Sequence, residues 1–176
     1  GKHMKLQKSL DAFLFCCYAG MRYSDFTNLS KKNIVDINQE TWLIYKSVKT
    51  GTEVRLPLYL LFAGKGIVIL NKYRNNLEDF FRLRDNSNIN KDLIIIAKLA
   101  GLSKKISFHT ARHTNATLLI YNGVNITTVQ KLLGHKSVKT TQVYTNIMDM
   151  TIVHDLEKMK QAALGIKKKT DNSFNK

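Results

Sequence analysis

The sequence predicts an α+β fold, a mainly helical domain with a small three-stranded antiparallel sheet. Three observations lead to this prediction. Apolar residues recur at helical spacing along most of the chain, whereas residues 33–58 are rich in β-forming residues and are divided by turn residues. The chain also has a single proline in 176 residues, which leaves its helices uninterrupted. Its hydrophobic content of 44% is enough for a sizeable core.

The first part of the chain is predicted to form two helices. Gly20 can end the first of them, whose apolar face consists of Leu6, Leu10, Phe13, Leu14 and Cys17. Ser24 is expected to cap a second, short helix over residues 25–29. Neighbouring cysteines rarely bridge each other, so we interpret Cys16 and Cys17 as core residues in a reducing, cytoplasmic compartment.

Residues 33–58 are predicted to form the sheet as a three-stranded meander. The strands are expected at residues 34–37, 42–48 and 54–58, with turns at residues 38–40 and 49–52. Pro57 ends the last strand because it cannot donate a ladder hydrogen bond.

The rest of the chain is predicted to be helical. One or two helices over residues 59–74 are interrupted near Gly64 and Gly66, and the polar residues 82–90 form a surface loop. Further helices are expected at residues 93–100, 108–121, from Asn125 or Thr127 to Gly134, from Ser137 to Tyr144, and at 152–166.

The chain is predicted to hold one domain, at residues 5–166. Residues 1–4 have the character of a tag or cloning remnant, and residues 167–176 form a basic tail that we expect to be disordered. Because the apolar pattern begins in the middle of a helix, we expect the chain to be cut from a longer protein.

The charge distribution predicts a polyanionic partner. There are 28 Lys and Arg against 13 Asp and Glu, a net charge of +15, which favours nucleic acid or an anionic membrane surface. No apolar run approaches the roughly 18 residues that span a bilayer, so membrane insertion is excluded. Residues 93–148 contain no acidic residue, and we interpret them as the phosphate-facing half. The DNA contacts expected there are Lys104, Lys105, Lys131, Lys136 and Lys139.

The same acid-free stretch holds basic and phenolic residues that suit phosphoryl transfer without a metal. His109 and Arg112 lie three apart on one helical face, His135 follows a glycine, and Tyr144 comes later in the same block. Arginines can neutralise phosphate oxygens, imidazoles can move protons, and a phenol can attack phosphorus. His109 and His113 also have the spacing of metal ligands, but no third ligand is evident, so we predict no metal and no cofactor.

Four blocks together resemble the catalytic domain of the tyrosine recombinase (phage integrase) family, over residues 5–163. Residues 19–25 (AGMRYSD) are similar to the family's first-arginine motif, and Lys49-Thr50-Gly51 lies in the turn where the family has its lysine. Residues 109–113 (HTARH) resemble the His-x-x-Arg box, although Ala111 replaces a more usual leucine. Residues 132–145 resemble the block that holds the second histidine and the nucleophile.

The resemblance implies a covalent mechanism. Tyr144 would attack the scissile phosphate, form a 3′-phosphotyrosine and release a 5′-hydroxyl. Arg22 and Arg112 would clamp the phosphate oxygens. His109 and His135 would hydrogen-bond the phosphoryl group, with His109 as the acceptor of the tyrosine proton.

The resemblance also assigns supporting residues. Lys49 would protonate the departing 5′-oxygen, with Lys46 and, more remotely, Lys65 as competing positions. Asp25 would orient other site residues, since a carboxylate beside the phosphate would repel it. His113 is expected to pack behind the site.

The resemblance implies double-stranded DNA as the substrate and self-association on it, as a tetramer in the full-length protein. The Asn-, Lys- and Ile-rich composition favours an integrase of a bacterial mobile element. An apolar stripe on residues 152–166 would dock on a neighbouring protomer or on its own domain. The alternatives are a type IB topoisomerase, with the same chemistry on one duplex, and a helical DNA-binding module without chemistry.

Overall fold

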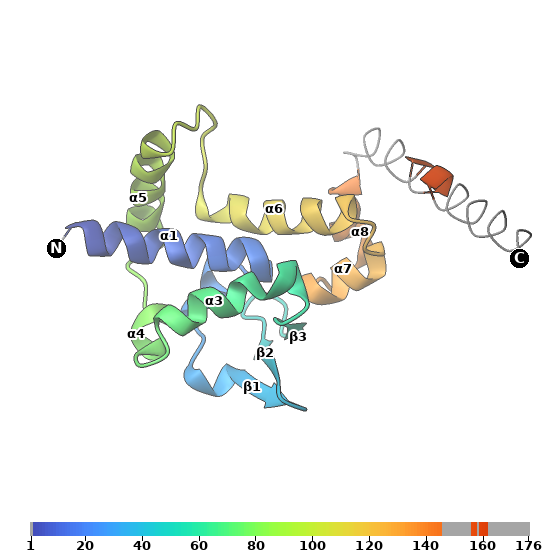
Figure 1. Ribbon diagram of the computed structural model, residues 1–176, viewed down its shortest axis with the longest axis horizontal. Coiled ribbons are helices and arrows are strands. Elements are labelled where there is room, and N and C mark those ends of the chain that lie inside the picture. Colours follow the sequence, from blue (N-terminus) through green and yellow to red (C-terminus); the bar gives the residue numbers. More distant parts are fainter. Residues whose placement is uncertain (1, 146–155, 158, 162–176) are drawn as a thin grey trace, which may run out of the picture.

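The computed structural model describes residues 2–145, 156, 157 and 159–161, and it confirms the predicted fold class. One small sheet lies at one side of the helices (Figure 1). The elements in chain order are α1 (Lys2–Ala19), α2 (Tyr23–Thr27), η1 (Lys31–Asn33), β1 (Ile34–Ile37), β2 (Glu40–Lys46), β3 (Glu53–Pro57), η2 (Leu61–Gly64), α3 (Lys65–Lys72), α4 (Leu77–Phe81), α5 (Asn86–Leu99), α6 (Phe108–Tyr121), α7 (Ile126–Leu133) and α8 (Val138–Gln142). None of the described helices is long and apolar enough to cross a membrane.

Helix α1 is the central element, and α3, α5 and α6 all pack against it (Figure 1). Its surroundings correct the predicted apolar face. Leu6, Leu10 and Leu14 are only half-buried, while Ala12 and Phe15 are completely buried. A helix that packs on several sides does not present one apolar stripe, so its periodicity was a poor guide to its orientation.

Two buried polar residues tie α1 to its neighbours. Asp11 accepts hydrogen bonds from Lys72 Nζ at 2.9 Å and from the Tyr73 hydroxyl at 2.8 Å. Ser9 donates to Asp92 Oδ2 on α5 at 2.6 Å. Because a buried polar group is costly unless it is bonded, these pairs specify how α1 sits between α3 and α5.

The sheet follows the predicted meander, with strand order β1-β2-β3 and antiparallel pairing. Leu43 on β2 lies opposite Ile34 on β1 and Leu56 on β3. Strand β2 begins and ends two residues earlier than expected, because Ser47 belongs to the next turn: its N–H donates to Thr52 O, and its carbonyl accepts from the Gly51 N–H.

Several helix boundaries differ from the predictions. Ser24 lies inside α2, and Arg22 occupies the N-cap position in an extended conformation, so the predicted cap is wrong. The predicted loop at residues 82–90 is also wrong, because Asp85 caps α5 by accepting from the Asn88 N–H, and α5 starts at Asn86. Helix α4, which was not predicted, has Asn76 as its cap.

The remaining predicted boundaries are close to those observed. Helix α6 has the expected bounds, Asn125 caps α7, and Gly134 ends it in the left-handed conformation. Ser137 caps α8, which ends at Gln142 and not at Tyr144. The predicted helix at 152–166 lies mostly outside the described residues, of which 156, 157 and 159–161 are helical.

An aromatic cluster joins α2, which follows Arg22 directly, to α6, which carries Arg112. Phe26 on α2 contacts Phe15, Phe80, Phe81 and Phe108, with ring centroids 5.3–6.3 Å apart. Phe108 is the first residue of α6, directly before His109. Burial of these rings therefore holds the start of α6 against α2.

Candidate active site

Arg112 is deeply buried for a charged residue, with 2% of its surface exposed. Its Nη1 donates to Gly20 O at 2.7 Å and its Nη2 to Leu133 O at 2.6 Å. Burial, and next the charge of Arg22, lower the pKa of Arg112 to about 10, so it stays protonated at neutral pH. The two backbone carbonyls orient the guanidinium group but carry no net charge, so Arg112 keeps its positive charge for binding an anion.

Two glycines allow the helix ends to approach Arg112 this closely. Gly20 and Gly134 have φ values of +69° and +63°. A Cβ on Gly20 would lie 2.6 Å from Asn115 Oδ1, and one on Gly134 would lie 2.6 Å from Val54 Cγ2. Both positions therefore require glycine for conformation and for space.

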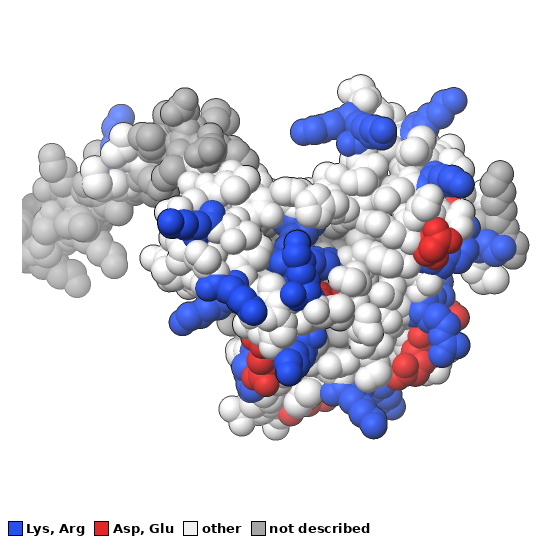
Figure 2. Space-filling view, turned by 180° about the vertical axis from the view of Figure 1, so that it is seen from behind, with Lys and Arg blue, Asp and Glu red and all other residues white. Residues whose placement is uncertain are grey.

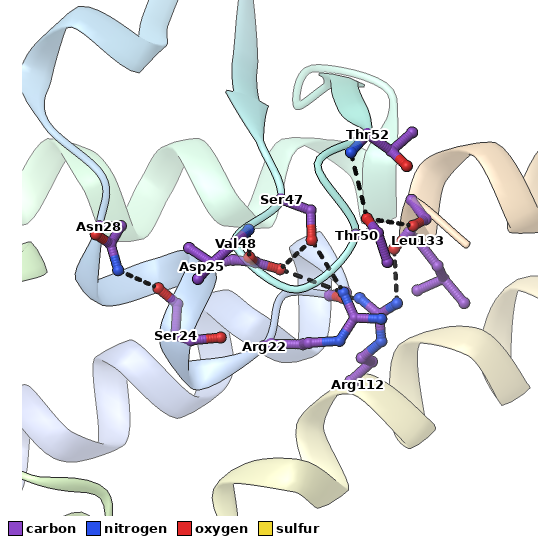
Figure 3. A network of polar contacts seen from close by, with 12 residues as sticks. Arg22, Ser24, Asp25, Asn28, Ser47, Val48, Thr50, Thr52, Arg112 and Leu133 are labelled. Atoms are coloured by element: carbon purple, nitrogen blue, oxygen red, sulfur yellow. Dashed lines mark hydrogen bonds and ion pairs between the residues drawn. The ribbon is translucent and has the colours of Figure 1, made fainter. Parts of the chain in front are cut away.

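Asp25 organises the other side of the site (Figure 3). This buried carboxylate accepts from the Val48 N–H at 2.8 Å and from the Ser47 hydroxyl at 3.4 Å. Arg22 Nη1 lies 3.2 Å from Ser47 Oγ and 3.5 Å from Asp25 Oδ2. Asp25 thus links Arg22 to the turn between β2 and β3, an arrangement that fits the predicted orienting role.

Lys49 extends from that turn with an exposed side chain. The turn is held to the end of α7 by Thr50, whose hydroxyl donates to Gly134 O at 3.1 Å (Figure 3). Of the competing lysines, Lys46 is paired in register with Glu53 at the end of β2, and Lys65 lies 5.9 Å from the ring centre of Tyr18. Of these three candidate lysines, Lys49 is the one that lines the same hollow as Arg22 and Arg112.

That hollow has a volume of about 320 Å³. It is lined by Met21, Arg22, Tyr23, Ser24, Lys49, Asn86, Phe108, His109 and Arg112. No acidic residue of the described chain is among these lining residues, so the hollow attracts anions. Figure 3 shows the guanidinium groups of Arg22 and Arg112 close together, and the charge of Arg22 contributes to the lowered pKa of Arg112.

His135 and Tyr144 lie next to this hollow and not among its lining residues. Their rings are parallel within 3°, with centroids 6.5 Å apart, and both residues are buried. His113 lies between the two groups, 5.2 Å from the Tyr144 ring and 4.3 Å from the His109 ring. His113 therefore has a more central place than the sequence indicated.

Two histidines of the site, His109 and His135, are neutral at neutral pH. Burial is the largest cause of the lowered pKa of His109, followed by the charges of His113 and Arg112. Burial, followed by the charges of Arg112, Arg22 and Lys49, lowers the pKa of His135 to about 4. Neutral imidazoles can accept a proton or donate a hydrogen bond, which are the two tasks expected of them.

The five predicted DNA-contacting lysines are all exposed. Lys104 and Lys105 precede α6, and Lys131 is on α7. Lys136 precedes α8, and Lys139 is in its first turn. Asn86 lines both the site hollow and a second hollow that contains Lys105, so a polar surface leads from the site along α5. Figure 2 shows basic side chains in a central hollow and around it, with most of the acidic surface toward the edges.

Several residues that shape the site were not predicted. They are Ser47, Thr50, Asn115 and Thr141, which act through hydrogen bonds between segments far apart in sequence. The one available signal was that each of them lies within three residues of a motif residue along the chain. Within the described residues, no group of three or more metal-ligating side chains is present.

An α+β domain that gathers two arginines, a lysine, three histidines and a tyrosine around an acid-free hollow is suited to phosphoryl transfer without a metal. The chain belongs to the phage integrase family, which it matches over residues 4–150. The predicted family is thereby confirmed.

Known relatives and structures agree with this assignment. The chain is 30% identical over 159 residues to tyrosine recombinase XerC of Rickettsia prowazekii (strain Madrid E), covering 85% of this chain and 49% of the relative. It is 34% identical over 134 residues to tyrosine recombinase XerA of Saccharolobus solfataricus, covering 73% of this chain and 42% of the relative. The chain thus spans about half the length of the curated relatives it matches.

Among solved structures, a XerA recombinase superimposes with a TM-score of 0.66 at 25% identity, covering 87% of this chain and 63% of that one. A lambda integrase dimer bound to a COC′ core site gives a TM-score of 0.64 at 21% identity, covering 81% of this chain and 56% of that one. The second likeness shows the fold alone. Neither rival function, the topoisomerase or the DNA-binding module without chemistry, is favoured by these comparisons.

Proposed function

We propose that residues 5–166 are the catalytic domain of a site-specific DNA recombinase, which cleaves and rejoins DNA through a 3′-phosphotyrosine. The observation that carries this proposal is the acid-free hollow where Arg22, Lys49, His109 and Arg112 meet, with Tyr144 beside it. A phosphodiester fits this hollow because its two non-bridging oxygens can accept from both guanidinium groups.

In the proposed step, the Tyr144 oxygen forms a bond to phosphorus as the bond from phosphorus to the 5′-oxygen breaks. His109 takes the proton of the tyrosine, and Lys49 gives a proton to the departing 5′-oxygen. The phosphodiester energy is kept in the new link, so a 5′-hydroxyl of another strand can reverse the step without ATP or a metal.

Electrostatics makes this attack feasible. A free phenol has a pKa of about 10, so about 0.1% is ionised at neutral pH, a deficit of roughly 4 kcal/mol. Two guanidinium groups and a lysine stabilise the charge that develops on the phosphoryl oxygens. Arg112 is fixed by two backbone carbonyls, so it needs little reorganisation during the reaction.

Double-stranded DNA is the proposed substrate, held by the exposed lysines of the acid-free stretch. Self-association on DNA and a mobile-element origin are parts of the same proposal. The lambda integrase of known structure is a dimer on a core site, which is consistent with assembly on DNA.

The test is a selection, which identifies the cognate site together with the activity. Duplexes with a randomised window and a nick close to it are incubated with the chain, and covalent protein–DNA adducts are recovered after denaturation and sequenced. The proposal predicts adducts with one enriched sequence, equally in chelator and in Mg²⁺. The Tyr144→Phe variant is the control. An absence of adducts would favour the non-catalytic DNA-binding module.

A second assay separates recombination from relaxation. Two duplexes carrying the enriched site are tested for strand exchange, and a supercoiled plasmid is tested for relaxation. Full-length protein should exchange strands between the duplexes. Relaxation without exchange would instead indicate the topoisomerase activity.

A further inference from the structure

The side chain of Thr141 binds His135 directly. Thr141 Oγ1 lies 2.9 Å from His135 Nδ1. Thr141 is completely buried and His135 has 7% of its surface exposed, so bulk water does not compete for this bond. Among the described residues the other ring nitrogen, Nε2, has no comparable partner, which leaves it available to a bound molecule.

Thr141 is also bonded to the segment that carries the proposed nucleophile. Its carbonyl accepts from the Tyr144 N–H at 3.0 Å. The rings of His135 and Tyr144 are parallel, with centroids 6.5 Å apart. One residue therefore contacts His135 through its side chain and Tyr144 through its backbone.

The chemistry of a phosphate decides which proton arrangement His135 needs. A neutral imidazole has one N–H donor and one acceptor nitrogen, and phosphodiester oxygens only accept. His135 can donate to such an oxygen from Nε2 only if Nδ1 is the acceptor. A threonine hydroxyl can donate to Nδ1, whereas a carboxylate or a carbonyl at this position would require the opposite tautomer.

We propose that Thr141 is a positioning residue, whose hydroxyl donates to Nδ1 and holds His135 in the Nε2–H tautomer that donates to the scissile phosphate. This role rests on the proposed function, since it needs a phosphate as the partner of Nε2. The alternative is that Thr141 only fills space in α8. Valine has nearly the same shape as threonine, so it tests the hydroxyl separately from the packing.

The first experiment reads the tautomer without any reaction. Long-range ¹H–¹⁵N correlation spectra of the imidazole rings, with His135 assigned from His135→Gln, show which ring nitrogen carries the proton. The wild type should show Nε2–H, Thr141→Ser should preserve it, and Thr141→Val should give a mixture of tautomers. A wild type with Nδ1–H, or a Thr141→Val spectrum like that of the wild type, would overturn the proposal.

The second experiment measures single-turnover adduct formation on the selected nicked duplex. Thr141→Val should slow it roughly tenfold with unchanged DNA binding, as expected for one lost hydrogen bond, and Thr141→Ser should restore most of the rate. In a His135→Gln background, Thr141→Val should have no further effect. An equal slowing in that background would show a purely structural role and overturn the proposal. Failure of the wild type to form any adduct would contradict the proposed function, and the spectra alone would then decide the role of Thr141.

Discussion

Replacing Asp25 with asparagine tests how the site tolerates its own positive charge. Asp25 is 1% exposed and accepts from the Val48 N–H, the Ser47 hydroxyl and Arg22. Asparagine preserves the shape but removes the charge that faces Arg22 and supports the Lys49 turn. Hydrogen bonds to charged groups contribute about 1.5–3 kcal/mol each, and breaking a buried ion pair costs about 3–5 kcal/mol. Because the Arg22 contact is long and partly exposed, we expect a loss of about 2–3 kcal/mol in the free energy of unfolding.

For a chain of this length, that loss corresponds to a fall in Tm of roughly 4–12 °C. Circular dichroism melts, with and without sulfate, provide the assay. Sulfate should stabilise Asp25→Asn more than the wild type, because an anion in the hollow replaces part of the missing negative charge. Asp36→Asn is the matched control, since Asp36 is exposed and bonds only Thr41. A Tm for Asp25→Asn as high as that of the control in the buffer without sulfate would refute this view of Asp25.

Three further predictions concern the helix end, the pH response and the leaving group. Gly134→Ala should lower the free energy of unfolding by about 2–4 kcal/mol, because the added Cβ would clash with Val54 Cγ2 and the backbone would keep a positive φ that alanine disfavours. Adding Val54→Ala should recover part of this loss, and denaturant titration measures both variants. The folded-state pKa of His135, about 4, lies below its usual value of 6.5. Between these two pH values the unfolded chain binds a proton at His135 that the folded chain does not bind. The contribution of the neutral His135 to the stability of the folded state is therefore complete above pH 6.5 and is lost as the pH falls toward 4. The stability difference between wild type and His135→Gln should therefore shrink by roughly 2–3 kcal/mol over that range, whereas a constant difference would show that His135 is not desolvated. Sulfur in place of the bridging 5′-oxygen should rescue cleavage by Lys49→Ala, because a thiolate leaves without protonation, and rescue of Lys46→Ala in its place would move the general acid to that residue.

Local signals predicted the parts of this fold that local chemistry determines. The bounds of α6, the Asn125 cap and the end of α7 at Gly134 follow from short-range capping and turn preferences. The buried face of α1 could not be predicted in this way, because neighbours on several sides determine which residues of a central helix are buried.

The candidate site shows the same division. The types and the order of its residues could be predicted from the sequence, but the hydrogen bonds between them could not. Arg112 bonds Gly20 O, 92 positions away, and Thr50 bonds Gly134 O, 84 positions away. Contacts of this kind arise only when the helix ends have packed, so no sequence period or spacing reports them.

The central claim is that Tyr144 attacks the scissile phosphate. The most direct measurement is mass spectrometry of the peptide that carries nucleotide in the covalent adduct from the selected duplex. We predict a single modified peptide with a 3′-linked nucleotide on Tyr144, and no adduct from a folded, DNA-binding Tyr144→Phe variant. Nucleotide on Tyr121 or Tyr45, or an adduct that persists in Tyr144→Phe, would contradict the account.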